Sequence, residues 1–452
     1  MPVYGFESQS PWSLDKGIAP PLVAASDPSV IGFDDPAATD AERVGPKAAN
    51  LARLARAGLP TPGGFCITAD AYRLQCAVLG LDDALHRFGE ASPPEQRRLS
   101  VDIRLKLYQA AIEPRILEPL LTAWRAQRQA SGAPGAIRSS ALIEDRAGAN
   151  FAGQFESFLG ITDEAELLTA VRACWAALWT TNARRYMGNH GINPADTAMA
   201  VIVQPVIPAR ASGGGLSETA EGQMLLSATW GLGSAIAQGE VVPDRIVLSR
   251  QGFLRKIEAG RKHHRETCTH GQGTAAEAVP KALVSAPCLE PGQAVTLGRL
   301  LKKTEGLIGM PVEIEWALDD EGFKLLQARP LHVEPAIVPD EIWLQHPAIN
   351  GHPAGIGWGA GRAVVVNCEC ELSRVAPGDI LVTRVAGPAL SHILPRVAGV
   401  VAELGGSTSH LASLARERGI PMVLGVLDAT SRIPDGAQVA VDGVAGIVRW
   451  IR

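Results

Sequence analysis

The chain has 452 residues, of which 46% are hydrophobic and 20% are charged. This length and composition are typical of a globular protein with about two to four domains, and they exclude a disordered or fibrous chain. The formal net charge of −5 provides no basic surface, so nucleic acid is not an expected partner.

Membrane and secretory signals are also missing from the sequence. No apolar run approaches the roughly 20 residues that span a bilayer. The N-terminal MPVYGFESQSPW has neither the basic start nor the apolar core of a secretory signal. We therefore expect a cytoplasmic protein without a membrane partner.

The cysteines predict a reduced protein. There are seven of them, an odd number at scattered positions, which favours free thiols over a disulfide framework. Cys368 and Cys370 form a C-x-C motif. The segment HHRETCTH, residues 263–270, contains possible metal ligands but no second spaced pair. A solvated loop is the favoured interpretation of this segment, with a metal site as the alternative.

The chain begins with a lead-in, residues 1–40, whose Pro, Ser and Asp content predicts extended structure. In the segment 44–73, Leu51 and Leu54 recur at helical spacing before Gly58 ends the helix. Further helical patterns follow, and they lead into the first strands.

The middle of the chain alternates between strand and helix patterns. Two short strands joined by a charged turn are predicted in 136–161, and a helix follows over about 164–190. Strand-like runs with glycine-rich breaks fill 199–249, whereas 255–290 is polar and irregular. Another helix is expected from about residue 292.

The segment PVEIEWALDDEGFKLLQARPLHV predicts a β-hairpin around an Asp-Asp-Glu-Gly turn. Strand alternation places Glu313 and Glu315 on one face, and Gln327 and Arg329 on one face of the partner strand. Two carboxylates opposite an amide and a guanidinium are unusual in a core. This polar surface suits a metal–phosphate site.

The C-terminal part predicts a linker followed by a compact unit. Residues 336–360 are rich in proline and glycine and are interpreted as a semi-rigid hinge. From about residue 361 the pattern is α/β, with short strands around one helix that follows GGSTSH at 405–410. The preceding VAGVVAEL is typical of a buried strand, so this is a strand–turn–helix unit.

The start of that helix favours an anion. Its first N–H groups lack partners and the helix dipole is positive there. Thr408 and Ser409 are both suitable capping residues. The imidazole of His410 can attack phosphorus and hold a phosphoryl group covalently. The local pattern alone leaves open whether His410 does so or simply packs at the helix start.

Five segments together resemble a known family. They are VGPKAANL, IRSSALIED with FAGQFESFL, TWGLGSAIAQGEVVPD, VEIEWALDDEGFKLLQARP and GGSTSHLASLARERGIPMVLGV, in this order. The chain is identified by them as similar to the dikinases exemplified by phosphoenolpyruvate synthase, pyruvate phosphate dikinase and rifampin phosphotransferase. In such proteins a histidine collects a phosphoryl group from ATP, and its domain rotates to deliver it. ATP is converted to AMP and phosphate.

The resemblance implies an α/β (α+β) fold with a definite domain order. Residues 41–335 would form an ATP-grasp-like nucleotide-binding domain, with subdomains over about 41–195 and 196–335. The stretch 336–360 would be the hinge, and 361–452 the swivelling phosphohistidine domain.

The resemblance also implies which residues bind ATP. Lys47 and Arg138 match the cations that hold the polyphosphate, with an ordinary surface cation as the alternative for each. Gly153 and Ser157 match positions that line the phosphates. Gln204 matches the hinge residue beside the nucleotide, with strand packing as its alternative.

A second set of residues matches the transfer chemistry. Glu315 and Gln327 match Mg²⁺ ligands, which are oxygen donors of the kind that magnesium prefers. Arg329 matches the cation that faces the transferred phosphate, although an ion pair between Glu315 and Arg329 is an alternative. His410 matches the phosphorylated histidine, and Thr408 the threonine of the family's Thr-x-His.

Some positions depart from the family pattern. Ser234 replaces an acidic residue after W-G-L-G, Pro46 replaces a glycine, and ARASGGGLSET at 209–219 replaces a more apolar segment. These departures affect the expected lid over ATP. They leave His410 and the metal ligands unchanged.

The acceptor of the phosphoryl group has no evident domain. The pyruvate-binding barrel of the synthases would follow the phosphohistidine domain, and the sequence ends at Arg452. We therefore expect a hydroxyl-bearing small-molecule acceptor on a separate protein subunit, as in enzymes resembling phenylphosphate or alkylphenyl phosphate synthases. The alternatives are a self-contained kinase of a small alcohol or antibiotic bound between the domains, and a non-catalytic nucleotide-binding module.

Overall fold

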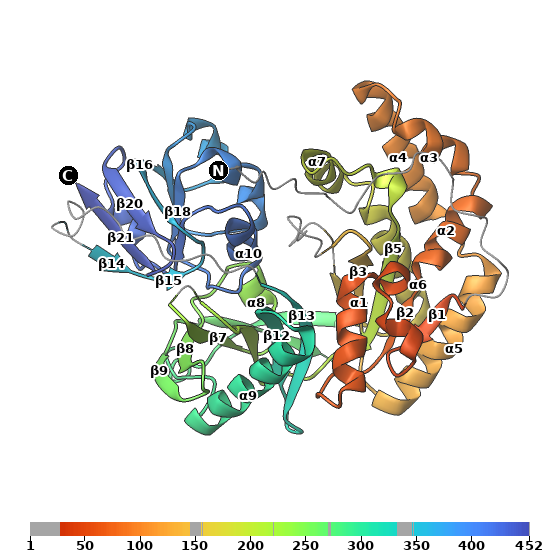
Figure 1. The fold of residues 1–452 in the computed structure, drawn as a ribbon, viewed down its shortest axis with the longest axis horizontal. Coiled ribbons are helices and arrows are strands. Elements are labelled where there is room, and N and C mark those ends of the chain that lie inside the picture. Colours follow the sequence, from red (N-terminus) through yellow and green to blue (C-terminus); the bar gives the residue numbers. More distant parts are fainter. Residues whose placement is uncertain are drawn as a thin grey trace, which may run out of the picture.

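The computed structural model describes residues 28–144, 155, 157–219, 221–269, 273–331, 346 and 348–451. These residues form three bodies: a first lobe in red to yellow-green, a second lobe in green to teal, and a C-terminal domain in blue (Figure 1). The described helices include none that is both long and apolar enough to cross a membrane. The mixed α/β fold expected from the sequence is confirmed.

The first lobe is an antiparallel five-stranded sheet covered by helices. Its strands, in the order β1-β2-β5-β3-β4, are Val30–Gly32, Phe65–Ile67, Met199–Pro205, Gly135–Ala141 and Ser157–Ile161. Its helices are α1 Ala41–Arg56, α2 Ala69–Val78, α3 Asp82–Phe88, α4 Pro93–Gln109, α5 Pro114–Ser131, α6 Glu164–Ala177 and α7 Thr181–Asn189, with short turns η1 Pro36–Thr39 and η2 Pro194–Asp196. Trp175 and Trp179 of this lobe are fully buried in its core.

The second lobe is an antiparallel six-stranded sheet. Its strands, in the order β13-β12-β6-β7-β8-β9, are Phe323–Pro330, Val312–Leu318, Ala211–Leu216, Gln223–Trp230, Asp244–Ser249 and Leu254–Glu258. Helix α9, Pro291–Ile308, packs on one face against Met224, Leu248 and Ile314. The opposite face carries Glu313 and Glu315, as expected from strand alternation.

The polar stretch 255–290 is more regular than the sequence suggested. It contains a hairpin of β10, His264–Thr269, and β11, Gly273–Ala278, beside the short helix α8, Ser234–Ala237. The loop interpretation of HHRETCTH was wrong, because its described part is mostly strand. No group of three or more potential metal ligands occurs among the described residues.

The C-terminal domain is an eight-stranded sheet with the order β14-β21-β20-β16-β17-β18-β19-β15. These strands are Ala348–Asn350, Ile447–Ile451, Gln438–Asp442, Trp358–Val366, Ile380–Thr383, Gly399–Ala402, Met422–Leu424 and His352–Pro353. Only Gly351 separates β14 from β15. Because β14 pairs with β21 and β15 pairs with β19, at opposite ends of this order, the chain closes the sheet on itself. Both strands lie within the stretch 336–360 that was interpreted as a linker.

Helices and turns cover this closed sheet. They are α10 His410–Glu417, α11 Ala429–Arg432, η4 Glu369–Arg374, η5 Pro388–His392 and η6 Leu394–Arg396. Residues Leu411 and Leu414 of α10 are buried in the same core as Leu381 and Val400 of the sheet.

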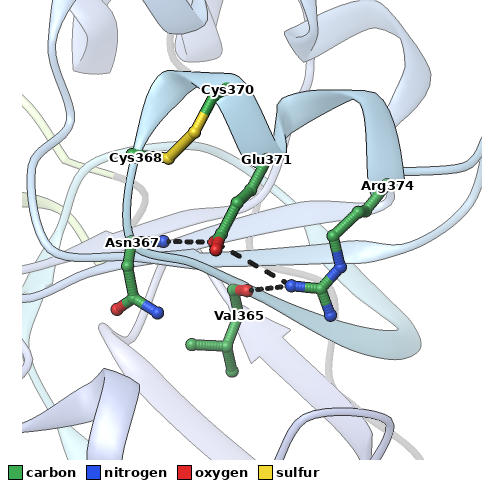
Figure 2. The surroundings of a disulfide bond; sticks show 6 residues. All are labelled: Val365, Asn367, Cys368, Cys370, Glu371 and Arg374. Carbon is green, nitrogen blue, oxygen red and sulfur yellow. Dashed lines mark hydrogen bonds and ion pairs between the residues drawn. A yellow bond between two sulfur atoms is a disulfide. The ribbon is translucent and has the colours of Figure 1, made fainter.

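The expectation of reduced cysteines was wrong for one pair. Cys368 and Cys370 form a disulfide where β16 ends and the chain turns into η4 (Figure 2). The turn brings these two exposed residues together, whereas counting cysteines considered only a framework of distant pairs. Glu371 accepts from the N–H of Asn367 at 2.9 Å, and Arg374 donates to the carbonyl of Val365 at 3.1 Å. The other five cysteines are free.

Candidate active site

The strand–turn–helix unit predicted around His410 is confirmed. Strand β18 leads into Gly405, whose φ of 102° is in a region that favours glycine. Ser409 is the N-cap of α10, because its hydroxyl accepts from the N–H of Ala412 at 3.2 Å. His410 is the first residue of the helix, which ends before Gly419.

Of the two predicted capping residues, Thr408 does not cap the helix. Its hydroxyl is buried without a hydrogen-bond partner. Its side chain lies against Gly214 of β6, where an added Cβ would come within 2.5 Å of the Thr408 Cβ. The turn before His410 is therefore seated on the sheet of the second lobe.

The predicted metal ligands face one cationic group. Glu315 and Gln327 are paired in register on β12 and β13. Arg138, on β3 of the first lobe, donates from the same nitrogen to Glu315 Oε2 at 2.7 Å and to Gln327 Oε1 at 2.8 Å. Two hard oxygen donors thus converge on the position of a positive charge. With phosphate oxygens and water completing the set, they fit Mg²⁺.

The ion pair weighed for Glu315 and Arg329 is not the one that these residues make. Arg329 lies opposite Glu313 and pairs with it at 2.9 Å, while Glu315 pairs with Arg138. The two carboxylates also differ in access. The side chain of Glu315 is 41% exposed, whereas that of Glu313 is 7% exposed. Only Glu315 is open to a ligand.

Lys47 lies near enough to His410 for its charge to lower the pKa of the imidazole. Gly45, with φ 76°, interrupts α1, and the helix resumes at Pro46. The Nζ of Lys47 is 3.0 Å from Oε1 of the fully buried Glu144. Sequence reasoning assigned no role to Glu144, although it belongs to the IRSSALIED segment.

Two of the remaining predicted nucleotide residues, Gln204 and Ser157, lie on the first-lobe sheet. Gln204 is buried on β5 and donates to the carbonyl of Gly63 at 3.0 Å. Ser157 begins β4 opposite Arg138 and is exposed. Gly153 lies outside the described residues.

The electrostatic environment keeps His410 neutral at pH 7. Burial is the main cause that lowers the pKa of the imidazole, and Arg329 and Lys47 lower it further. Glu315 and Glu313 oppose this shift without reversing it. Since the ordinary pKa is about 6.5, the neutral ring keeps a lone pair available for attack on phosphorus.

The carboxylate of Glu315 remains ionised. Loss of solvent around the carboxylate would raise its pKa, but the charges of Arg138 and Arg329 and the hydrogen bond from Arg138 together outweigh this, and the pKa lies below its usual value. A negative oxygen that faces His410 and Arg138 is suited to hold a divalent cation.

Two family models match the chain. The pyruvate phosphate dikinase AMP/ATP-binding domain matches residues 41–343, and the mobile domain of PEP-utilising enzymes matches residues 375–446. Phosphoenolpyruvate synthase of Aeropyrum pernix is 31% identical over 90% of this chain and 56% of its own length. The synthase of Pyrococcus furiosus is 31% identical over 92% of this chain and 58% of its own length.

The chain thus spans less than two thirds of these relatives, over the part that carries both matched domains. Lys47, Arg138, Glu315 and Arg329 lie inside the first match, and His410 lies inside the second. The chain belongs to the pyruvate phosphate dikinase and phosphoenolpyruvate synthase family.

Proposed function

We propose that this protein is a dikinase-type phosphotransferase. ATP binds to an ATP-grasp-like domain, residues 41–335, and the β-phosphoryl passes through His410 to a hydroxyl acceptor. The observation that carries this proposal is the seating of the turn before His410 on Gly214, which is paired in register with Glu315. The charges of Glu315, Arg329 and Lys47 all act on the imidazole, which is the first residue of α10. A nucleophile, a metal-binding oxygen and two phosphate-binding cations are thereby assembled.

The proposed phosphorylation of His410 has two steps. The His410 lone pair attacks the β-phosphorus, the bond to the α-phosphate oxygen breaks, and AMP leaves. Water then attacks the terminal phosphorus, which releases phosphate and leaves phosphohistidine. Bound Mg²⁺ would supply charge neutralisation for these oxygens, held by Glu315 and Gln327.

The other residues bind and orient the nucleotide. Arg138 suits a bidentate contact with phosphate oxygens, and Lys47 a point contact. Ser157 and Gly153 line the phosphates, and Gln204 lies beside the base. These assignments follow the family match, and those of Arg138, Ser157 and Gln204 are also supported by their positions on the first-lobe sheet.

Arg329 and Thr408 complete the proposed transfer site. Arg329 stabilises the charge that develops on the moving phosphoryl group. Thr408, seated beside Gly214, orients the histidine turn.

The test uses the full chain with Mg²⁺ and ATP labelled at the β-phosphate. We expect an acid-labile label on the protein, release of AMP, and no label on a His410→Asn variant. Equal labelling of the variant would refute the assignment. Absence of label on the parent chain would refute the proposed activity and support the alternative of a non-catalytic nucleotide-binding module.

For the acceptor we propose a phenol or alkylphenol bound on a separate subunit. In this structure His410 lies against the second lobe, so phosphohistidine must leave that lobe before an acceptor can approach it. Labelled chain would be mixed with phenol, with and without a candidate acceptor subunit. Transfer only when the subunit is present would support this proposal, whereas transfer to phenol alone would contradict it.

One cavity tests the alternative of a self-contained kinase. A cavity of about 50 Å³ lies between the second lobe, at Leu216 and Val247, and the C-terminal domain, at Ile356 and Val444. It is much smaller than the roughly 150 Å³ cavity that holds benzene. The residue of α10 that lines it is Arg416, about 9 Å along the helix from His410. The separate subunit is therefore the better supported reading.

A further inference from the structure

Helix α10 contacts both nucleotide lobes through residues that follow His410. On the side of the second lobe, one oxygen of Glu313 is shared by three donors. Oε2 lies 2.9 Å from Arg329, 3.0 Å from the Ser413 hydroxyl and 3.0 Å from Arg416. Arg329 belongs to β13, whereas Ser413 and Arg416 belong to α10. A single buried carboxylate thus joins the two bodies.

On the side of the first lobe, a second group of contacts surrounds α7. The Tyr186 hydroxyl donates to Glu417 Oε1, and the Nε2 of His190 is 3.6 Å from the same oxygen. The guanidinium of Arg418 lies 5.7 Å from the centre of the Tyr186 ring. The last turn of α10 is therefore held by the first lobe while its middle is held by the second.

We propose that Ser413, Arg416 and Glu417 form a docking clamp that positions His410 on the ATP site. This inference rests on the proposed phosphorylation of His410. In an eight-residue helix, contacts on both sides fix the helix axis, and with it the direction in which the first residue points. These three are positioning residues, since none of them is expected to touch ATP.

The clamp can open without leaving Glu313 or Arg416 without a partner. When the domain leaves, Glu313 keeps Arg329 as its partner on the second lobe. Arg416 keeps its hydrogen bonds to the carbonyls of Ser407 and Ala354 in its own domain. An uncompensated buried charge would strongly oppose release, and this arrangement avoids it.

The experiment measures phosphorylation of His410 in a single turnover, with the full chain and saturating Mg²⁺ and ATP. Ser413→Ala and Arg416→Gln are the variants on the second-lobe side. We expect phosphorylation to be slower by about tenfold or more, with unchanged ATP affinity, because ATP contacts lie on the lobes. Spontaneous loss of the phosphoryl group, which needs no docking, should keep its parent rate.

The variant on the first-lobe side is Tyr186→Phe, which removes the hydroxyl bound to Glu417 and keeps the ring under Arg418. It should slow phosphorylation less than Ser413→Ala. Because Arg416 also supports its own domain, Ser413→Ala is the safer test, and thermal unfolding of each variant shows whether it is folded. Ser431→Ala and Arg432→Gln, at exposed positions of α11, are the matched controls.

The outcomes separate the clamp from the proposed function. If the parent chain takes no label, phosphorylation of His410 itself fails. If the parent is labelled and the folded Ser413→Ala and Tyr186→Phe variants match its rate, the clamp is refuted. A slower rate that is fully explained by weaker ATP binding would also refute it.

Discussion

The two faces of the second-lobe sheet are made by the same strands and have opposite roles. On β12, Ile314 and Trp316 point to α9 and are buried at 1% and 0% exposure. The alternate residues, Glu313 and Glu315, point to α10 and to Arg138. One face therefore provides hydrophobic stability, and the other carries the charges that we propose for docking and catalysis. Substitutions of neighbouring residues on this strand should accordingly affect different quantities, either the free energy of unfolding or the rate of His410 phosphorylation.

The largest expected effect is on the apolar face. Trp316→Ala should lower the free energy of unfolding by about 3–5 kcal/mol, because it removes a fully buried ring that packs against Phe323 and donates to the carbonyl of Gly214. Denaturant titration measures this loss. A change below about 1 kcal/mol would contradict the division between the faces.

The neighbouring residue should show the reverse. Glu315→Gln keeps the shape of the side chain and removes the charge that would hold Mg²⁺, so His410 phosphorylation should fall about 100-fold. Stability should change by less than about 1 kcal/mol, since this side chain is 41% exposed. Asp320→Asn, an exposed change in the turn of the same hairpin, is the control. A large loss of stability in the Glu315→Gln variant would contradict the division between the faces.

Acid should lower the free energy of unfolding through His352, a buried residue of β15. Burial is the main cause that lowers the pKa of His352 to about 4, and Arg245 adds to it while Glu258 and Asp244 oppose it. The unfolded chain binds this proton near pH 6.5, so stability present above that pH is lost as the pH falls toward 4. The loss should reach about 2 kcal/mol at pH 5.

Unfolding measured at pH 7 and pH 5 tests this expectation. His352→Gln should reduce the difference between the two pH values. An identical difference in the variant would mean that other groups dominate the acid response.

A smaller effect is expected where the polar face has no side chain. Gly214→Ala places a Cβ within 2.5 Å of the Thr408 Cβ, so the histidine turn cannot seat fully, and phosphorylation should slow about tenfold. Single-turnover labelling with chemical quenching measures the rate of His410 phosphorylation. Gly292→Ala, on α9 behind the sheet, has open space around the added carbon and should leave the rate unchanged.

Local patterns were sufficient to predict much of this site. The hairpin that carries Glu315 and Gln327 is encoded by strand alternation on either side of a tight turn, and its register followed. The start of α10 was evident from the glycine turn and from Ser409, which caps the helix. In both cases the decisive residues are close together in the sequence.

Contacts between distant segments could not be predicted in this way. Glu313 meets Arg416 across 103 positions, and Arg138 meets Glu315 across 177. The sequence signals only that such charges need partners, and it does not say which. The hairpin of β10 and β11 was missed because its strands are polar and lack the alternation of a half-buried sheet. The Cys368–Cys370 bond was missed because a cysteine count does not describe a tight turn.

The closed sheet of the C-terminal domain determines what must move together. Since β14 pairs with β21 and β15 pairs with β19, residues 348–353 belong to the sheet of this domain and would rotate with His410 in the proposed motion. A probe attached to this segment would therefore report the motion of the phosphohistidine itself.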